Sequence, residues 1–206
     1  MQSPRRTQAE RRAETRAALL RAGASLFAAK GFAETGAEEI VASAGVTRGA
    51  LYHHFKDKAD LFETIVEQAF ADIVAEIDAA AAQAPDPASA LRLGSLAWLR
   101  ASQHRARRRI LLIDAPAVIG WDKWRALDSR YGMGSLREGL AAVARDRAIK
   151  LPDIEIAAHL LSGALNEAAL LLAAHGRDKA FQRRLEASVG ALLDCILEAP
   201  RGGAKR

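Results

Sequence analysis

Three short helical segments separated by glycine-containing turns occupy the start of the chain and strongly limit how it can fold. Leu19, Gly23 and Phe27 recur at the spacing of one helix face. Gly31 and Gly45 each follow a helical stretch, and glycine commonly ends helices. The predicted helices cover residues 11–30, 37–44 and 48–54. This layout predicts a compact unit of three helices.

A fourth predicted helix begins at Asp57 and carries a long apolar stripe from Leu61 onward. Pro85 and Pro87 break it. The composition does not shift toward that of a flexible linker at residues 55–60. We therefore expect this helix to join the three-helix unit rigidly to the remainder of the chain. Further helices follow, with turn signals at residues 114–120, 131–134, 151–153 and 175–178. Ala, Leu, Glu and Arg dominate and no alternating β-type run occurs, so the predicted fold class is all-α.

The chain has an excess of basic residues and no apolar run long enough to span a membrane. The formal net charge is +5 in 206 residues, which suits a polyanionic partner such as nucleic acid. The single cysteine, Cys195, allows no intramolecular disulfide and fits a reducing compartment. The longest apolar run, Ala168 to Ala174, is too short to span a bilayer. We therefore expect a soluble, cytoplasmic protein with no membrane association.

Three motifs in the first third of the chain carry a family resemblance. They are GFAET at residues 31–35, AGVTRGALYHHF at 44–55 and KADLF at 58–62. In this order and spacing they resemble the tetracycline-repressor (TetR) family of transcription regulators, over residues 12–70. The resemblance implies a homodimer with a helix-turn-helix DNA-binding domain over residues 11–56. It also implies a helical ligand-binding and dimerisation domain over residues 57–200, and a repressor that a small molecule releases from its operator.

The second helix of a helix-turn-helix lies in the major groove and places its N-terminal residues at base edges. Arg48 is the expected base reader, because a guanidinium pairs with two acceptors of guanine; a solvated surface role is the alternative. Tyr52 is expected to donate to phosphate rather than merely to pack. Thr35 is predicted to be an N-cap that binds phosphate. The predicted DNA-binding set is Thr35, Thr47, Arg48, Gly49, Tyr52, His53, His54 and Lys58.

The ends of the chain are predicted to be flexible. Residues 1–10 are polar and basic and are expected to form a disordered arm, and residues 201–206 a flexible tail. The arginines at positions 5, 6, 11, 12 and 16 are either solvated or reach DNA. The basic run from Arg105 to Arg109 is expected to be a solvated helix end, with a second DNA contact as the alternative. Asp114 is a possible N-cap before Pro116.

The C-terminal two thirds of the chain diverge more, and residues 110–124 look like the ligand-binding region of one TetR subgroup. Apolar and aromatic walls with few polar groups are typical of small-molecule sites, although the same residues are commonly plain core. Asn166 and Glu167 stand out as polar groups within an apolar helix. The candidate ligand-binding residues are Leu112, Val118, Trp121, Trp124, Tyr131, Leu160, Ala164, Asn166, Glu167 and Leu171.

Two apolar helical stretches near the end of the chain predict a dimer interface. Residues 156–174 are apolar on nearly every side of the predicted helix. Other parts of the protein must therefore cover this helix on more than one side. Residues 181–197 carry a second apolar stripe. The candidate interface residues are Leu161, Leu165, Leu172, Phe181, Leu185, Val189, Leu192 and Ile196.

No catalytic motif, metal-ligand spacing or cofactor signature was found, so we expect no catalytic residue, metal or cofactor. His53 and His54 are adjacent and point about 100° apart on a helix, which disfavours joint chelation. The predicted partners are double-stranded DNA with a near-palindromic operator, an unidentified small-molecule effector and a second copy of the chain. The alternatives are a helical small-molecule-binding protein or enzyme without a DNA role, and a DNA-binding protein whose C-terminal part only dimerises.

Overall fold

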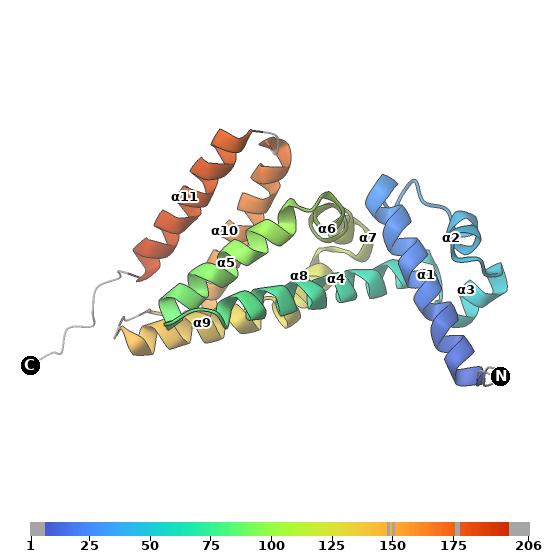
Figure 1. The fold of residues 1–206 in the computed structure, drawn as a ribbon, viewed down its shortest axis with the longest axis horizontal. Helices are drawn as coiled ribbons and strands as arrows, with labels where there is room; N and C mark the ends of the chain where they lie inside the picture. The colour runs from blue at the N-terminus through green and yellow to red at the C-terminus, as the bar shows by residue number, and fades with distance from the viewer. Residues whose placement is uncertain (1–6, 148, 150, 176–177, 198–206) are drawn as a thin grey trace, which may run out of the picture.

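A computed structural model describes residues 7–147, 149, 151–175 and 178–197. The predicted all-α class is confirmed: these residues form helices joined by short turns, with no strand among them. Figure 1 shows α1 to α3 as a small head at one end of α4, and the later helices as a body along its other end. The elements are α1 (Gln8–Lys30), α2 (Ala37–Ala44), α3 (Arg48–His54), α4 (Lys58–Ala81), α5 (Pro87–Gln103), α6 (Arg105–Arg108), the π-helical turn η1 (Arg109–Asp114), α7 (Ala115–Ile119), α8 (Trp121–Tyr131), α9 (Met133–Asp146), α10 (Ile154–His175) and α11 (Lys179–Leu197).

Helix α1 begins earlier than the sequence pattern predicts. Thr7 accepts a hydrogen bond from the Glu10 amide, and the Glu10 carboxylate accepts one from the Thr7 amide at 2.7 Å. This capping box satisfies backbone donors at the start of the helix. Residues 7–10, expected to be part of a disordered arm, are therefore the ordered first turn of α1. Residues 1–6 and 201–206 lie outside the described part of the chain.

Three aromatic rings join the head to the first turns of α4. Phe62 of α4 makes edge contacts with Phe27 and Phe32, with ring centroids 5.1 Å apart in each pair. Phe27 and Phe62 are completely buried. Gly23 lets α4 come close, because a side chain there would meet Ile65 at 3.0 Å. The start of α4 is therefore part of the head core, as its apolar stripe predicts.

The rest of α4 packs along α5 and forms one wall of the body (Figure 1). Asp57 caps the helix by accepting from the Asp60 amide at 2.8 Å, in agreement with the predicted start. Phe70 and Ile73 are buried against the body. One continuous helix of 24 residues thus belongs to both the head core and the body.

A polar clamp formed by Arg109 and Asp114 of η1 provides a second link between head and body. Arg109 donates to the carbonyl oxygens of Ala29 (3.3 Å) and Lys30 (2.6 Å) at the end of α1. The Asp114 carboxylate accepts from the Phe32 amide at 3.0 Å and lies 3.8 Å from Arg109. Arg109 thereby supplies donors to carbonyl oxygens that lack helical partners.

The clamp changes two sequence expectations. The run from Arg105 to Arg109 is not simply a solvated helix end, because Arg107 also pairs with Glu76 of α4 through two bonds of 2.6 and 2.9 Å. Asp114 makes no N-cap hydrogen bond to α7. Its carboxylate instead accepts a hydrogen bond from the Phe32 amide of the head. The turn expected at residues 114–120 is helical through Ile119, because η1 continues directly into α7, and Gly120 ends the helix.

Helix α10 is the apolar centre of the body. By length and composition alone it is the one helix among the described residues that could cross a membrane. It packs instead against α5, α9 and α11. Seven of its residues are buried there, among them Ala158, Leu161 and Leu165. Its apolar character is therefore accounted for in part by packing within the chain.

Removing the Phe62 ring should destabilise the head and its junction with α4. We expect Phe62→Ala to lower the free energy of unfolding by about 3–5 kcal/mol, since it leaves a cavity between Phe27 and Phe32. Urea denaturation followed by circular dichroism measures the change. The control is Phe181→Ala on α11, whose ring is only partly buried. An equal loss in both variants would contradict a special role for the aromatic junction.

Breaking the clamp should loosen the head locally. In Asp114→Ala the Phe32 amide loses its acceptor, so we expect its hydrogen exchange to be about tenfold faster. Exchange at amides of α10 should not change. The matched control is Asp122→Ala, an exposed carboxylate on α8. Unchanged exchange at Phe32 would show that the clamp does not hold this turn.

Candidate DNA-binding head and ligand pocket

Helices α2 and α3 and the turn between them form a compact helix-turn-helix. Gly45 ends α2 with φ of +66°, a left-handed conformation that favours glycine. Thr47 caps α3, its hydroxyl accepting from the Ala50 amide at 3.2 Å. Ile40 and Leu51 are completely buried. This packing fixes the angle between the helices and leaves the N-terminal end of α3 exposed.

The exposed end of α3 presents Arg48 and Tyr52 together. The Arg48 guanidinium carbon lies 5.6 Å from the centre of the Tyr52 ring, and Tyr52 is 46% exposed. Arg48 also forms an ion pair of 2.7 Å with Glu38 of α2. Because both charged groups are largely exposed, this pair contributes little to stability and can separate readily.

The side chains of Thr35 and Lys58 form hydrogen bonds within the head. Thr35 is 1% exposed, and its hydroxyl donates to the Gly31 carbonyl at 2.7 Å. The N-cap of α2 is Gly36, so the predicted N-cap at Thr35 is wrong by one residue. Lys58 donates to the carbonyls of Phe32 (2.9 Å) and Thr35 (2.8 Å). It thus fixes the turn between α1 and α2.

His53 is exposed and His54 is half-buried. Partial burial, together with nearby His53, Arg12 and Arg16, lowers the pKa of His54. These surroundings favour the neutral form of His54 in the free protein. Among the described residues, no group of three or more His, Cys, Asp or Glu side chains could hold a metal ion.

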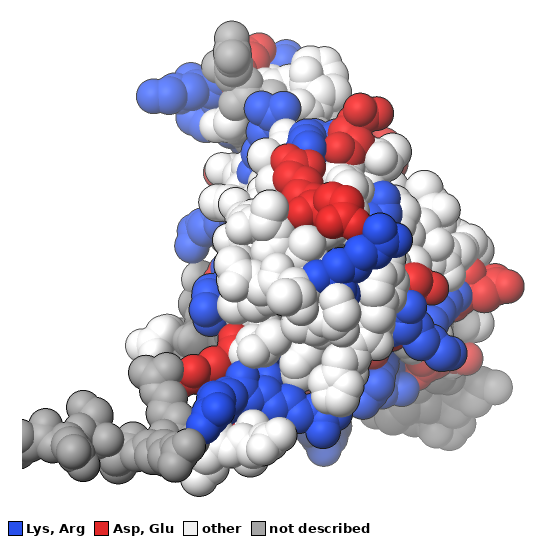
Figure 2. Space-filling model, turned by 90° about the vertical axis from the view of Figure 1, so that its right-hand side faces the viewer, with Lys and Arg blue, Asp and Glu red and all other residues white. Residues whose placement is uncertain are grey.

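Figure 2 views the head end of the molecule. Basic side chains lie along the lower part of this face, and others lie beside a group of acidic side chains higher up. A broad uncharged surface separates the lower basic side chains from the acidic group. The acidic residues of α2 are Glu38 and Glu39, and each has a basic partner, Arg48 and Lys30 respectively. The surface is thus mixed in charge.

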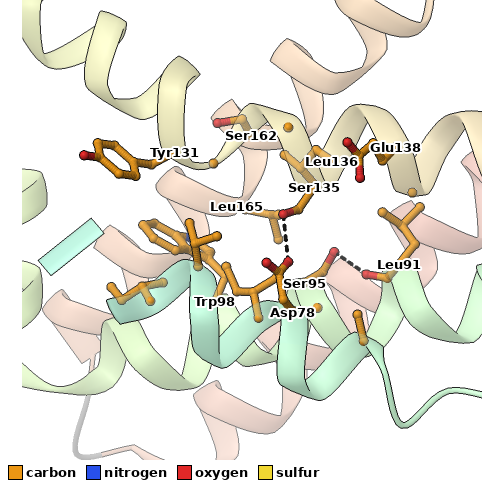
Figure 3. A pocket seen from close by; sticks show the side chains of 18 of the residues that line it. Asp78, Leu91, Ser95, Trp98, Tyr131, Ser135, Leu136, Glu138, Ser162 and Leu165 are labelled. Carbon is orange, nitrogen blue, oxygen red and sulfur yellow. Dashed lines mark hydrogen bonds between the residues drawn. The ribbon is translucent and has the colours of Figure 1, made fainter. Parts of the chain in front are cut away.

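A cavity of about 550 Å³ opens in the body between α4, α5, α8, α9 and α10. Figure 3 shows Trp98 and Tyr131 at one side, Leu91 and Glu138 at the other, and Asp78 between them. Its size is that of a pocket for a drug-sized molecule. Apolar side chains from α4, including Phe70, form part of its wall.

Polar groups reach the cavity at defined points. The Ser135 hydroxyl donates to Asp78 at 2.9 Å, as the dashed line in Figure 3 marks. Asp128 is 5% exposed and accepts from Ser162 at 3.3 Å. The Trp98 indole N–H is buried and has no hydrogen-bond acceptor among the described residues.

The ionisation of Asp128 is disfavoured by its surroundings. Burial raises the pKa of this carboxyl, although nearby Arg125 and hydrogen bonds from Ser162 and Asn166 act in the opposite direction. The Arg125 guanidinium lies 3.4 Å from the carboxylate and also contacts the His159 ring. The cavity therefore contains a buried acid whose charge is incompletely compensated.

Two family models match the chain. The model described as "Bacterial regulatory proteins, tetR family" matches residues 19–65, which include the helix-turn-helix. The model described as "Tetracyclin repressor-like, C-terminal domain" matches residues 88–196, more than half of the chain. The chain belongs to the TetR family. The predicted resemblance is confirmed, and it extends through the pocket-bearing body.

Individual TetR-family proteins resemble the chain to different extents. A TetR-family transcriptional regulator from Pectobacterium atrosepticum is 33% identical, with a TM-score of 0.75 over 95% of this chain and 100% of that one. The transcriptional regulator AcrR of Shigella flexneri is 41% identical over 48% of this chain, and the transcriptional repressor BepR of Brucella suis is 49% identical over 32%. The alignments span only 46% of AcrR and 31% of BepR.

Of the ten predicted ligand residues, Tyr131 and Asn166 line the cavity of this TetR-family chain. Leu112 lies at a smaller void beside it. Trp124 is buried and donates to the Leu111 carbonyl at 2.7 Å. The others do not line the cavity: Trp121, Leu160, Glu167 and Leu171 are exposed, and Val118 and Ala164 are half-buried.

The predicted dimer residues separate into two groups. Leu161, Leu165, Leu172 and Val189 are buried within the single chain, and Leu165 also lines the cavity. Phe181, Leu185 and Ile196 are half-buried, whereas Leu192 is 42% exposed. The large apolar side chains that one chain leaves exposed on α10 are Ile156, Leu160, Leu170 and Leu171.

Several cavity residues were missed by the sequence analysis. Asp128 could have been found, because it shares one helix face with Trp124, Leu127 and Tyr131. A carboxylate on an apolar face marks a special position. Asp78 and Ser135 carry no such signal, because only the folded chain brings α4 and α9 together.

Neutralising Asp128 should stabilise the ligand-free protein at higher pH. The folded-state pKa lies above the unfolded value, so this carboxyl costs stability progressively as the pH rises from the unfolded pKa through the folded one. We expect Asp128→Asn to gain stability relative to the parent protein as the pH rises above about 4, the range in which an unfolded carboxyl is ionised. Urea midpoints across this range measure the difference. A difference that is independent of pH, or that changes in the opposite direction, would contradict this description of Asp128.

Proposed function

We propose that the chain is a ligand-responsive, DNA-binding transcription regulator that represses until a small molecule releases it from its operator. The observation that carries the proposal is the continuity of α4, which begins in the core of the helix-turn-helix head and ends as a wall of the 550 Å³ cavity. The regulators and the repressor among its relatives support this reading. Action on DNA places the protein in the cytoplasm.

In this proposal the exposed N-terminal end of α3 contacts the DNA bases directly. Arg48 leaves Glu38 and pairs with a guanine edge, while Tyr52 donates to a phosphate. Gly49 is exposed, and a side chain there would meet nothing closer than the Thr47 hydroxyl at 3.9 Å. The open space beside Gly49 is therefore available to the DNA backbone.

The other predicted DNA residues have different parts in the proposal. His53 and His54 lie at the end of α3, where a neutral His54 gains a proton more readily beside phosphate. The Thr47 hydroxyl is occupied as the cap of α3. Thr35 and Lys58 act indirectly, by fixing the turn at the start of α2.

A homodimer presents two heads to the two halves of a near-palindromic operator. The exposed apolar side chains of α10 and α11 supply the contact in this proposal. Leu160, Leu171 and Leu192 are the residues that a partner would cover. Burial of such apolar area is the principal driving force of stable homodimers.

Ligand binding changes DNA affinity only if the two conformations of the body bind the ligand differently. A molecule between α4 and α9 would shift α4, and the Arg109–Asp114 clamp and the Phe62 contacts would carry the shift to the head. A similar fold has been solved with resorcinol bound: RolR, at 22% identity and a TM-score of 0.66. The alternative is a body that only dimerises and binds no ligand. A cavity of this size is less consistent with that alternative.

Arg48 should control sequence preference. We expect the protein to bind DNA from its own upstream region more tightly than random duplex, with both affinities falling as salt rises. Arg48→Ala should weaken specific binding by about 1–3 kcal/mol and random binding by less. Fluorescence anisotropy at two salt concentrations measures both.

The control for Arg48 is Glu38→Gln, which frees the guanidinium from its present partner. We expect that variant to bind DNA at least as tightly as the parent protein. Equal affinity for both duplexes at every salt concentration would contradict an operator in the upstream region. If Arg48→Ala and Tyr52→Ala both left all DNA binding unchanged, the assignment of α3 would be wrong.

A further inference from the structure

We propose that the effector bound in this cavity is a lipophilic organic cation, whose positive group lies among Asp78, Asp128 and Glu138. The inference rests on the proposed function, in which the cavity is the effector site. It adds the chemical class of the effector, which neither the family models nor the names of the relatives state.

The charge of the lining is one-sided. Asp78, Asp128 and Glu138 line the cavity, whereas none of its lining residues is Lys, Arg or His. An anion placed there would meet the carboxylates of Asp78 and Glu138 and the buried acid Asp128, with no cationic residue in the lining. Water screens this repulsion at the exposed Asp78 and Glu138, and screens it less around the buried Asp128. A cation instead gains an attractive interaction with the same groups.

The carboxylates are available to a ligand. Glu138 has no ion pair or hydrogen bond through its side chain among the described residues. The bond from Ser135 leaves Asp78 with free acceptor capacity. Asp128 has a long ion pair with Arg125, a residue outside the lining. The negative charge in the cavity is thus only partly neutralised by the protein itself.

The position of these groups suggests how a cation would lie. Figure 3 places Glu138 at one side of the cavity and Tyr131 at the other, with Asp78 between α4 and α9. Asp128 is buried on α8, three residues before Tyr131. Asp78 and Glu138 are exposed and can attract the cation at the entrance. Further inside, a bound cation would itself favour the ionised form of Asp128 and pair with it.

The remaining walls suit an apolar body with aromatic character. Phe70, Leu91, Trp98 and Tyr131 all contribute to the lining. The faces of Trp and Tyr rings attract organic cations directly. The Trp98 indole N–H is buried without an acceptor, so a ligand oxygen that reached it would satisfy an otherwise unpaired donor. We therefore expect an acceptor such as an ether oxygen in the apolar part of the ligand.

The test compares three probes that share one diphenylmethyl ether body and differ in the terminal group. They are 2-(diphenylmethoxy)-N,N-dimethylethylamine, 2-(diphenylmethoxy)ethanol and diphenylmethoxyacetic acid, which are cationic, neutral and anionic at neutral pH. Isothermal titration calorimetry on the full chain measures each affinity. We expect the amine to bind at least about tenfold more tightly than the acid, with the alcohol between them.

Matched variants locate the preference. The set Asp78→Asn, Asp128→Asn and Glu138→Gln, made singly and together, removes the charges with little change of shape. The combined variant should lose at least about tenfold in amine affinity while keeping alcohol affinity within about threefold. Retained alcohol binding shows that the cavity is still folded. The control Asp122→Asn removes an exposed carboxylate on α8 outside the cavity and should change none of the three affinities.

Each outcome separates the effector class from the function. Tighter binding of the acid or the alcohol than of the amine would overturn the cationic class, and so would an amine preference that survives in the combined variant. Release of operator DNA by the acid alone would also overturn the class while supporting the proposed function. Tight amine binding in the cavity that leaves operator affinity unchanged would support the class but contradict ligand control of DNA binding.

Discussion

The packing of Phe62 between Phe27 and Phe32 is the interaction on which the arrangement of head and body depends. It places the first turns of α4 inside the core of the head, and the same helix then forms a wall of the cavity. A helix is stiff over this length because each turn is hydrogen-bonded to the next. In the proposed function, a displacement of α4 at the cavity is therefore carried into the head.

The polar clamp on η1 complements this apolar junction. Arg109 holds the last carbonyls of α1, and Asp114 holds the following turn at Phe32. Gly31 lies at the centre, with φ of +89° and with the Arg109 guanidinium where a side chain would project. The helix carrying the clamp widens to a π-helical turn, a local departure from α-helix that is frequent at functional sites. The head is thus fixed to the body from two directions.

The sequence predicts the head more completely than the pocket. The end of α2 and the starts of α3 and α4 follow from local signals, namely Gly45, Thr47 and Asp57. The start of α1 was missed because its capping box lies in a basic, polar stretch. The cavity depends on which face of each body helix points inward. Helix α10 is apolar nearly all round, so Leu160 and Leu165 look equivalent in sequence although one is 70% exposed and the other 4%.

The central claim is that α4 transmits a change in the cavity to the position of the heads. Pulsed dipolar spectroscopy between spin labels tests it directly, with Ser43→Cys labelled on the exposed surface of α2 in a Cys195→Ser background. We expect one narrow distance between the two heads of the DNA-bound dimer and a different distance when a compound that releases DNA occupies the cavity. A compound that fills the cavity and releases DNA without changing this distance would contradict the claim.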